Sequence, residues 1–338
     1  MKNEIKTDAL GNSAFENRLV MPRWTWAAVA VLSLALISAL GLLCLFWSPD
    51  TTGYATRLGE QHYWMCRRQF LRLCVGGTFF AISLVIGWKR LLRASPYIAT
   101  GWVVMLAIAL CQTPIKGRHF LVVGPVVIDL WDDFSLIAAL LAAWFVEKFA
   151  VRHVVRFLML VATVYLGGFA VRMAMDSEKL ECAAAFFGRK LSPENELARL
   201  WGQKETCAAL RNGKWVVPSD EERRKWFLPG RFSRNAPVAA ALTHGKWILA
   251  VGLGLFVAFA CALVCAWRRT ESGAKKVFTA VGGGAVVLVP VLHGFCVWFG
   301  LLPPVIYSGI PLLSSGGSVW PVCILAGLLV SLARNDAA

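Results

Sequence analysis

The sequence predicts an all-α membrane protein: a polytopic helix bundle of about eight transmembrane helices with one large extracytoplasmic loop. Two observations predict this fold class. The 338 residues are 57% hydrophobic and only 16% charged, and their mean hydropathy of +0.59 lies outside the range of ordinary soluble domains. The apolar residues also fall into long runs that end at charged or turn-forming residues. Water is therefore not the main solvent of this chain.

The apolar runs set the predicted domain organisation. A bilayer core of about 30 Å requires about 20 mostly apolar residues per helix, and the third and fourth runs are the shortest. The first run has no convincing small-residue cleavage site, so we interpret it as a retained helix. Helices one to five then occupy residues 24–175, and helices six to eight occupy 237–333. The candidate spans are 24–47, 70–88, 97–111, 134–149, 154–173, 237–267, 277–302 and 318–333.

The Lys and Arg residues gather in alternate loops. This asymmetry is the positive-inside pattern, so the segments 1–23 and 334–338 of this multi-pass protein are both predicted to be cytoplasmic. The net charge of +15 then indicates topology and contact with anionic membrane lipids, and not nucleic-acid binding. The predicted inside cations are Lys2, Lys6, Arg18, Arg23, Lys89, Arg90, Arg93, Lys148, Arg152, Arg156, Arg268, Arg269, Lys275, Lys276 and Arg334. The short outside loops hold Arg57, Arg67, Arg68, Lys116 and Arg118.

The segment 176–236 changes abruptly to a mixture of acidic and basic residues, which predicts a soluble insertion on the outer side. It contains Cys182 and Cys207. A disulfide between them is compatible with an oxidising periplasm, and two free thiols are the alternative, because sequence gives no distance between them.

The outer segment 302–318 is of a different kind, because it is almost uncharged and rich in Pro, Gly and Ser. Non-helical backbone at membrane depth is tolerated only where protein surrounds it or where it lines a cavity. The composition therefore predicts a re-entrant loop at a functional site, with a tight hairpin as the alternative.

Motifs of soluble enzymes are absent from the sequence. It contains no phosphate-binding P-loop, no nucleophile elbow, no H-E-x-x-H and no C-x-x-C pair, and its five His residues have no metal-ligand spacing. No cofactor or metal is therefore predicted. The residues alone indicate a polytopic membrane protein with a polar outer face.

Three outer segments take the interpretation further. Near the C-terminus, Gly300-Leu301-Leu302-Pro303, Gly309-Ile310-Pro311-Leu312 and Ser314-Ser315-Gly316-Gly317-Ser318 resemble the GLLP, GxPLP and SYGGS signatures of the SEDS family (FtsW/RodA/SpoVE). The second Pro of the family pattern is missing here, and Ser315 stands where the family usually has Tyr.

Two further segments match in the same order and on the same side of the membrane. Residues 117–120 and 124–132 resemble the family's ARRWI and GPFSFQPSE elements, with Asp132 in place of the Glu. Residues 213–215 and 225–229 resemble its GGW and KxxLP elements, and Arg67-Arg68-Gln69 resembles a basic-Gln element before helix two. The resemblance covers most of the chain.

The resemblance implies a SEDS-type protein of cell-wall assembly in the bacterial inner membrane, in cell division or cell-shape control. Members of this family polymerise lipid II, transferring a glycan from an undecaprenyl pyrophosphate donor to an acceptor sugar, and they act with a class B penicillin-binding protein. Such chemistry needs a carboxylate as base and cationic or dipolar groups at the departing pyrophosphate. The implied substrate-side residues are Arg118, Asp132, Arg234, Ser314, Gly316 and Gly317, with Asp132 as the candidate catalytic residue.

The chain departs from the family at the expected catalytic Asp, where it has Arg234, which cannot accept a proton at physiological pH. Three explanations are open. The protein is a non-catalytic relative in which Arg234 pairs with pyrophosphate, or another outer carboxylate such as Asp132, Asp133 or Asp220 has replaced the Asp. Alternatively the register is shifted by one residue, although the neighbouring Asn235 does not restore a base.

These explanations leave three functional hypotheses. The first is a glycosyltransferase-like protein that polymerises or binds lipid II, and the second is a scaffold or regulator of the division or elongation machinery without turnover. A lipid transporter is the third, although the sequence shows no inverted repeat or pair of interrupted helices. The family typically has about ten helices, so the predicted helix count implies a shortened member that has lost the family's helices five and six.

Overall fold

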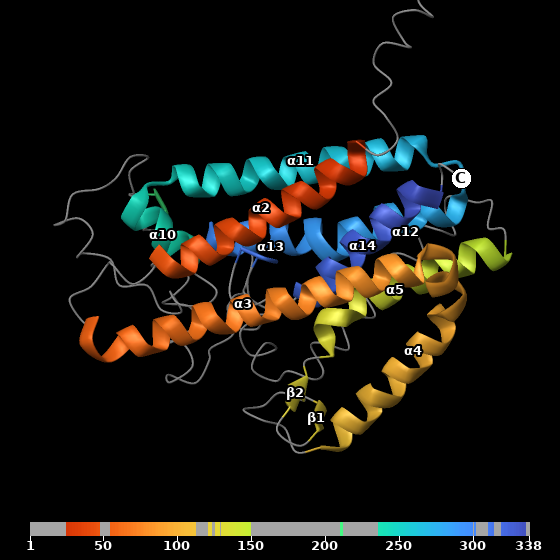
Figure 1. Cartoon of the computed structure of the whole chain (residues 1–338), viewed down its shortest axis with the longest axis horizontal. Coiled ribbons are helices and arrows are strands. Elements are labelled where there is room, and N and C mark those ends of the chain that lie inside the picture. Colours follow the sequence, from red (N-terminus) through yellow and green to blue (C-terminus); the bar gives the residue numbers. More distant parts are fainter. Residues whose placement is uncertain are drawn as a thin grey trace, which may run out of the picture.

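The computed structural model describes residues 25–47, 55–112, 121–123, 126–128, 130–149, 210–211, 236–299, 301, 310–313 and 319–335. The predicted span 154–173 and nearly all of the loop 176–236 lie outside these residues, and so does the position of the helix pair that the sequence predicts to be lost. The described residues form a helix bundle with one short β-hairpin (Figure 1). The predicted fold class, a polytopic membrane helix bundle, is confirmed.

Seven of the eight predicted spans coincide with described helices. Five stretches are long and apolar enough to cross a bilayer: α2, residues Cys66–Ile86 of α3, α4, α11 and the continuous run Gly273–Trp298. The other two predicted spans correspond to α5 and to the shorter apolar helix α14. The helices are α2 (Thr25–Trp47), α3 (Ala55–Ile86), α4 (Trp88–Cys111), α5 (Trp131–Phe149), α10 (Ala236–His244), α11 (Trp247–Arg269), α12 (Gly273–Gly283), the π-helix η2 (Gly284–Leu288), α13 (Val289–Trp298) and α14 (Val319–Asn335).

Three predicted boundaries are wrong. The predicted span 97–111 begins too late, because α4 starts at Trp88 and already contains Lys89, Arg90 and Arg93. The predicted span 237–267 is two helices, because Gly245 adopts a φ of 105° and its N–H caps α10 by donating to the carbonyl of Ala241 over 2.9 Å. In addition, Arg67 and Arg68 do not lie in a loop before helix two. They lie within α3, which begins at Ala55 and continues the helix through a polar stretch that a hydropathy search does not detect.

The bundle has two ends that differ in charge. At one end, where Figure 1 marks the C-terminus, α3, α5, α11 and α14 finish and α4 and α12 begin. We call this the basic end, and we call the opposite end, where α10 lies, the α10 end. The described cations of the basic end are Lys89, Arg90, Arg93, Lys148, Arg268, Arg269, Lys275, Lys276 and Arg334, which are the ones that the sequence predicts to share one side of the membrane.

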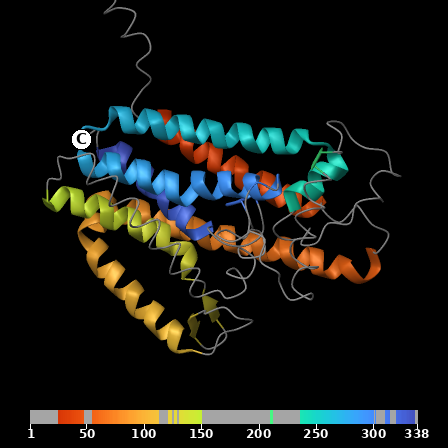
Figure 2. The ribbon, with the colours of Figure 1, turned by 180° about the vertical axis from the view of Figure 1, so that it is seen from behind.

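Helix α4 diverges from the bundle and carries the hairpin at its far end, as Figures 1 and 2 show from opposite sides. It is joined to α3 at Gly87, whose φ of 76° is accessible to glycine at low cost. A separate small core formed by Trp102, Ala109, Leu121 and Leu130 connects α4 to the hairpin and to the start of α5. The far part of α4 thus shares a small core with the hairpin, while Trp88 and Leu92 at its start belong to the main core.

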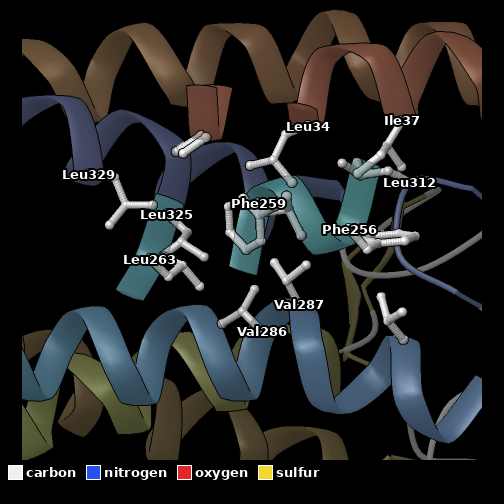
Figure 3. Packing of buried hydrophobic residues seen from close by; sticks show 14 of the residues in the cluster. Leu34, Ile37, Phe256, Phe259, Leu263, Val286, Val287, Leu312, Leu325 and Leu329 are labelled. Carbon is white, nitrogen blue, oxygen red and sulfur yellow. The ribbon is translucent and has the colours of Figure 1, made fainter. Parts of the chain in front are cut away.

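The main core includes side chains of α2, α11, η2 and α14, which meet in Figure 3. Phe259 of α11 lies between Leu34 of α2 and Val286 and Val287 of η2. Lipid chains are as apolar as these side chains, so close van der Waals packing, and not removal from water, holds such helices together.

Helix α14 packs most closely against α3, and the two helices run in the same direction. A Cβ at Gly76 of α3 would lie 3.2 Å from Val319 and 2.7 Å from Cys323, while Gly327 of α14 lies against Ser83 and the carbonyl of Phe80. Small residues on both helices thus allow the two backbones to approach.

Candidate functional site

The predicted site residues fall mostly outside the described part of the chain. Arg118, Arg234, Ser314, Gly316 and Gly317 are not described, and for Asp132 the structure gives the backbone only. Asp132 is the second residue of α5. A carboxylate in the first turn of a helix is stabilised by the positive end of the helix dipole, so an ionised side chain suits this position.

A short β-hairpin precedes Asp132 in the chain. Strands β1 (Leu121–Val123) and β2 (Val126–Ile128) pair antiparallel, with Val123 opposite Val126. The segment 124–132, which resembles the second SEDS element, therefore includes β2 and the first two residues of α5. The sequence predicts an outer loop here, and it does not indicate the strands.

Gln112, the residue that follows α4, holds the hairpin as a neighbouring strand would. Its Oε1 accepts the N–H of Val122 over 2.8 Å, and its Nε2 donates to the carbonyl of Val122 over 3.1 Å. Nearby, Nε1 of Trp102 donates to the carbonyl of Leu130 over 3.0 Å. Sequence reasoning missed both residues, because their partners lie 10 and 28 positions away in the chain without any periodic pattern.

The described part of the predicted re-entrant loop is buried in protein. Ile310, Leu312 and Leu313 are 0, 2 and 1% exposed. Ile310 fills the space beside Gly294 of α13, and the carbonyl oxygen of Leu312 lies against Gly41 of α2. Gly41 precedes the end of α2 by six residues, or about 9 Å of helix. Non-helical backbone is thus enclosed by helices at membrane depth, although the re-entrant course of the whole segment 302–318 stays a prediction.

The backbone of this loop is strained at Leu312. Its φ is 63°, and the N–H of Leu313 donates to the carbonyl of Pro311 over 2.7 Å, which makes a three-residue γ-turn of the rare form with positive φ. This region costs a non-glycine residue about 1–2 kcal/mol. Such strain persists only where the surroundings impose it and is often found at functional sites, so the contacts with α2 and α13 determine the shape of the loop.

Helix α10 covers the end of α2. The ring of His244 lies 4.8 Å from the ring of Trp47, and its carbonyl accepts Nε1–H of Trp247 over 2.7 Å. All residues from Ala236 to Leu242 are buried. Because α10 begins soon after Arg234 in the sequence, the structure brings the chain that follows Arg234 to the α10 end of the bundle.

The basic-Gln element before helix two, Arg67-Arg68-Gln69, divides into two environments. Arg67 and Arg68 are exposed, whereas Gln69 is 1% exposed and faces the interior of the bundle. Gln69 is thus a buried polar group near the α10 end, whereas the sequence grouped it with the two exposed arginines and gave no sign of its burial. Among the described residues, no group of three or more His, Cys, Asp or Glu side chains is close enough to hold a metal ion.

No family model matches the sequence, and no curated protein matches it. Solved structures do match. RodA of Thermus thermophilus, a rod shape determining protein, is 17% identical, with a TM-score of 0.62 over 95% of this chain and 99% of RodA. The chain has the RodA fold.

Two further solved structures agree with that fold. A mutant of the same RodA gives a TM-score of 0.63 at 17% identity, over 91% of this chain and 97% of RodA. A chain from a peptidoglycan synthase complex that coordinates polymerisation and crosslinking gives 0.64 at 17% identity, over 90% of this chain and 97% of its own length. At this identity the likeness shows the RodA fold alone, and it agrees with the SEDS resemblance of the sequence motifs.

Proposed function

We propose that this RodA-fold chain is a SEDS-type protein of cell-wall assembly that binds lipid II at the outer face of the bacterial inner membrane. One observation carries the proposal. The segments that resemble SEDS motifs are separate in the sequence, but they lead into α5, α10 and α14, and the starts of α5 and α14 are directed toward the end where α10 lies (Figure 1). The motif segments are therefore expected to gather at the α10 end of a molecule that has the RodA fold.

The proposed reaction is glycan transfer between lipid-linked sugars. A hydroxyl of the acceptor sugar attacks the anomeric carbon of the donor, the bond from that carbon to pyrophosphate breaks, and undecaprenyl pyrophosphate departs. The hydroxyl proton passes to a carboxylate base. We propose Asp132 as this base and Arg234 as a cation that pairs with the pyrophosphate, because a guanidinium binds phosphate oxygens in bidentate fashion and cannot act as a base.

The charge distribution supports the orientation in the membrane. With the basic end in the cytoplasm, as the positive-inside rule requires, both termini are cytoplasmic and α10 lies on the outer side, where lipid II is polymerised. By its likeness to a chain of a peptidoglycan synthase complex, we propose a class B penicillin-binding protein as the partner.

A scaffold without turnover is the second candidate, and the replacement of the expected Asp by Arg234 favours it. Polymerisation of lipid II by the purified protein, with its candidate penicillin-binding partner, separates the two. We expect polymer from the wild type and none from Asp132→Ala. Glu147→Ala is the matched control, since Glu147 is an exposed carboxylate of the same helix at the basic end.

The remaining outcomes assign the protein differently. Wild-type activity that survives Asp132→Ala would remove Asp132 from the reaction. Binding of lipid II without turnover, together with a gain of activity in Arg234→Asp, would identify a regulator derived from an enzyme. Failure of the wild type to bind lipid II would contradict the proposed function.

A further inference from the structure

The side chain of Gln69 is buried without satisfying its own hydrogen-bonding groups. It is 1% exposed, while its neighbours Arg68 and Phe70 are exposed, so the side chain points into the bundle. Within the part of the chain that the structure describes, neither its Oε1 nor its Nε2 has a hydrogen-bond partner. Gln112 shows the usual situation, since both of its amide atoms are bonded to Val122. A buried amide without partners is rare in folded proteins and requires an explanation.

The face of α3 that carries Gln69 is the face that packs on α14. Gln69, Gly76 and Ser83 recur every seven residues, so they line one side of the helix. Gly76 meets Val319, the first residue of α14, and Ser83 meets Gly327 about two turns further along both helices. Gln69 precedes Gly76 by two turns, and it therefore lies beyond the first residue of α14, where the first N–H groups of that helix are open.

Two contacts locate Gln69 relative to the buried loop. One turn before it, Sγ of Cys66 lies 4.0 Å from the carbonyl oxygen of Leu42 in α2. The adjacent residue of α2, Gly41, touches Leu312 of the loop. Gln69 thus lies where α2, α3, the start of α14 and the segment 310–313 come together. The apolar part of α3 begins at Cys66, so Gln69 lies about 5 Å inside that end of the apolar stretch.

We infer that Gln69 is a substrate-binding residue, whose amide hydrogen-bonds a hydroxyl or acetamido group of the sugar next to the pyrophosphate of the lipid-linked substrate. The inference rests on the proposed function. An amide offers two N–H donors and an oxygen acceptor, which complement the hydroxyl and amide groups of such a sugar. The positive end of the α14 dipole lies about two turns, or about 10 Å, from Gln69 along the same face, where it favours the phosphate next to that sugar. Gln69 is neutral, so it recognises the sugar and adds no charge.

Ligand binding and a structural role predict opposite effects of removing the amide. Gln69→Met keeps the length of the side chain and removes the polar atoms that are buried without partners. If the amide serves the ligand, the ligand-free variant is as stable as the wild type or more stable, and only binding suffers. If the amide supports the fold, the variant melts at a lower temperature.

The test uses the full chain in detergent micelles, with the melting temperature measured without ligand and the affinity measured with fluorescent lipid II. We expect Gln69→Met to bind lipid II about tenfold more weakly at an unchanged or higher melting temperature. Ser83→Ala is the control on the same face of α3. Its hydroxyl donates to the carbonyl of Phe80 within its own helix, over 2.8 Å, so its affinity for lipid II is expected to equal that of the wild type.

Several results would overturn the inference. Wild-type affinity in Gln69→Met would remove Gln69 from the binding site while the proposed function stands. A lower melting temperature in that variant would assign Gln69 to the fold. Gln69→Asn keeps the amide but shortens the side chain, and it serves as the second variant if Gln69→Met does not fold; wild-type affinity in Gln69→Asn would likewise contradict the inference. Absence of lipid II binding by the wild type would remove the proposed function itself, and the inference with it.

Discussion

The carbonyl oxygen of Leu312 lies in the space beside Gly41 that the Cβ atom of any other residue would occupy. This contact joins the first transmembrane helix to the segment before the last one, across most of the chain. It holds Leu312 at a φ of 63°, in a backbone conformation that a leucine does not adopt by preference. The absence of a side chain at position 41 is therefore a condition for the shape of the buried loop.

Gly41→Ala is expected to destabilise the protein by about 1–3 kcal/mol or to displace residues 310–313, because the new methyl group overlaps main-chain atoms that cannot rotate away. The melting temperature and the binding of lipid II measure the two effects. Gly254→Ala in α11 is the control, because a Cβ there meets nothing within 4 Å. It should be neutral or stabilise by about 0.5–1 kcal/mol, as expected for glycine to alanine in a helix. Equal melting temperatures and affinities in both variants would refute the packing at Gly41.

Ser331→Ala is expected to lower the free energy of unfolding by about 1–3 kcal/mol, because it leaves the buried N–H of Trp88 without an acceptor. Trp88 is the first residue of α4, so its N–H has no partner within that helix. The hydroxyl of Ser331 in α14 accepts it over 2.9 Å. Thr100→Ala is the control: its exposed hydroxyl bonds only to the carbonyl of Pro96 in its own helix. The two variants are compared by thermal unfolding, and a loss in Thr100→Ala as large as that in Ser331→Ala would contradict this explanation.

Gln112→Leu is expected to release the hairpin without unfolding the bundle. The variant removes both hydrogen bonds to Val122, so the amide of Val122 should exchange its hydrogen about tenfold faster or more. The melting temperature should change little, because the main core lies elsewhere. Hydrogen exchange followed by mass spectrometry measures the difference, with Cys111→Ser as the control at the neighbouring exposed position. Unchanged exchange of the hairpin in Gln112→Leu would show that strand pairing alone holds it.

The two ends of the bundle should lie on opposite sides of the membrane. The cations of the basic end are expected to remain in the cytoplasm, so green fluorescent protein fused after Ala338 should fluoresce. Alkaline phosphatase fused after Gln112, at the other end of α4, should be active, because it folds only outside the cytoplasm. The reverse pattern in both fusions would contradict the orientation.

The sequence predicted most of the membrane spans because bilayer thickness and loop charge act locally. A run such as 24–47 is long enough to cross by itself, and the helix α2 matches it almost to the residue. The errors of the sequence prediction are local too. Gly245 inside an apolar run looks like a helical residue until its φ is known, and the polar start of α3 at Ala55 has no apolar signal. The predicted roles of Arg118, Asp132, Arg234, Ser314, Gly316 and Gly317 stay predictions.

Only the tertiary structure decided the contacts between residues that no local sequence pattern connects. Gln69 stands next to two arginines in the sequence and was interpreted together with them, yet helix rotation exposes Arg68 and buries Gln69. Gly41 and Leu312 are separated by most of the chain. Sequence alone determined that this chain crosses a membrane and resembles a family, because solvation and motifs are properties of short segments. Which polar side chain is buried, and which glycine allows the backbone of another segment to approach, depends on packing between distant segments. Only the assembled bundle determines this packing.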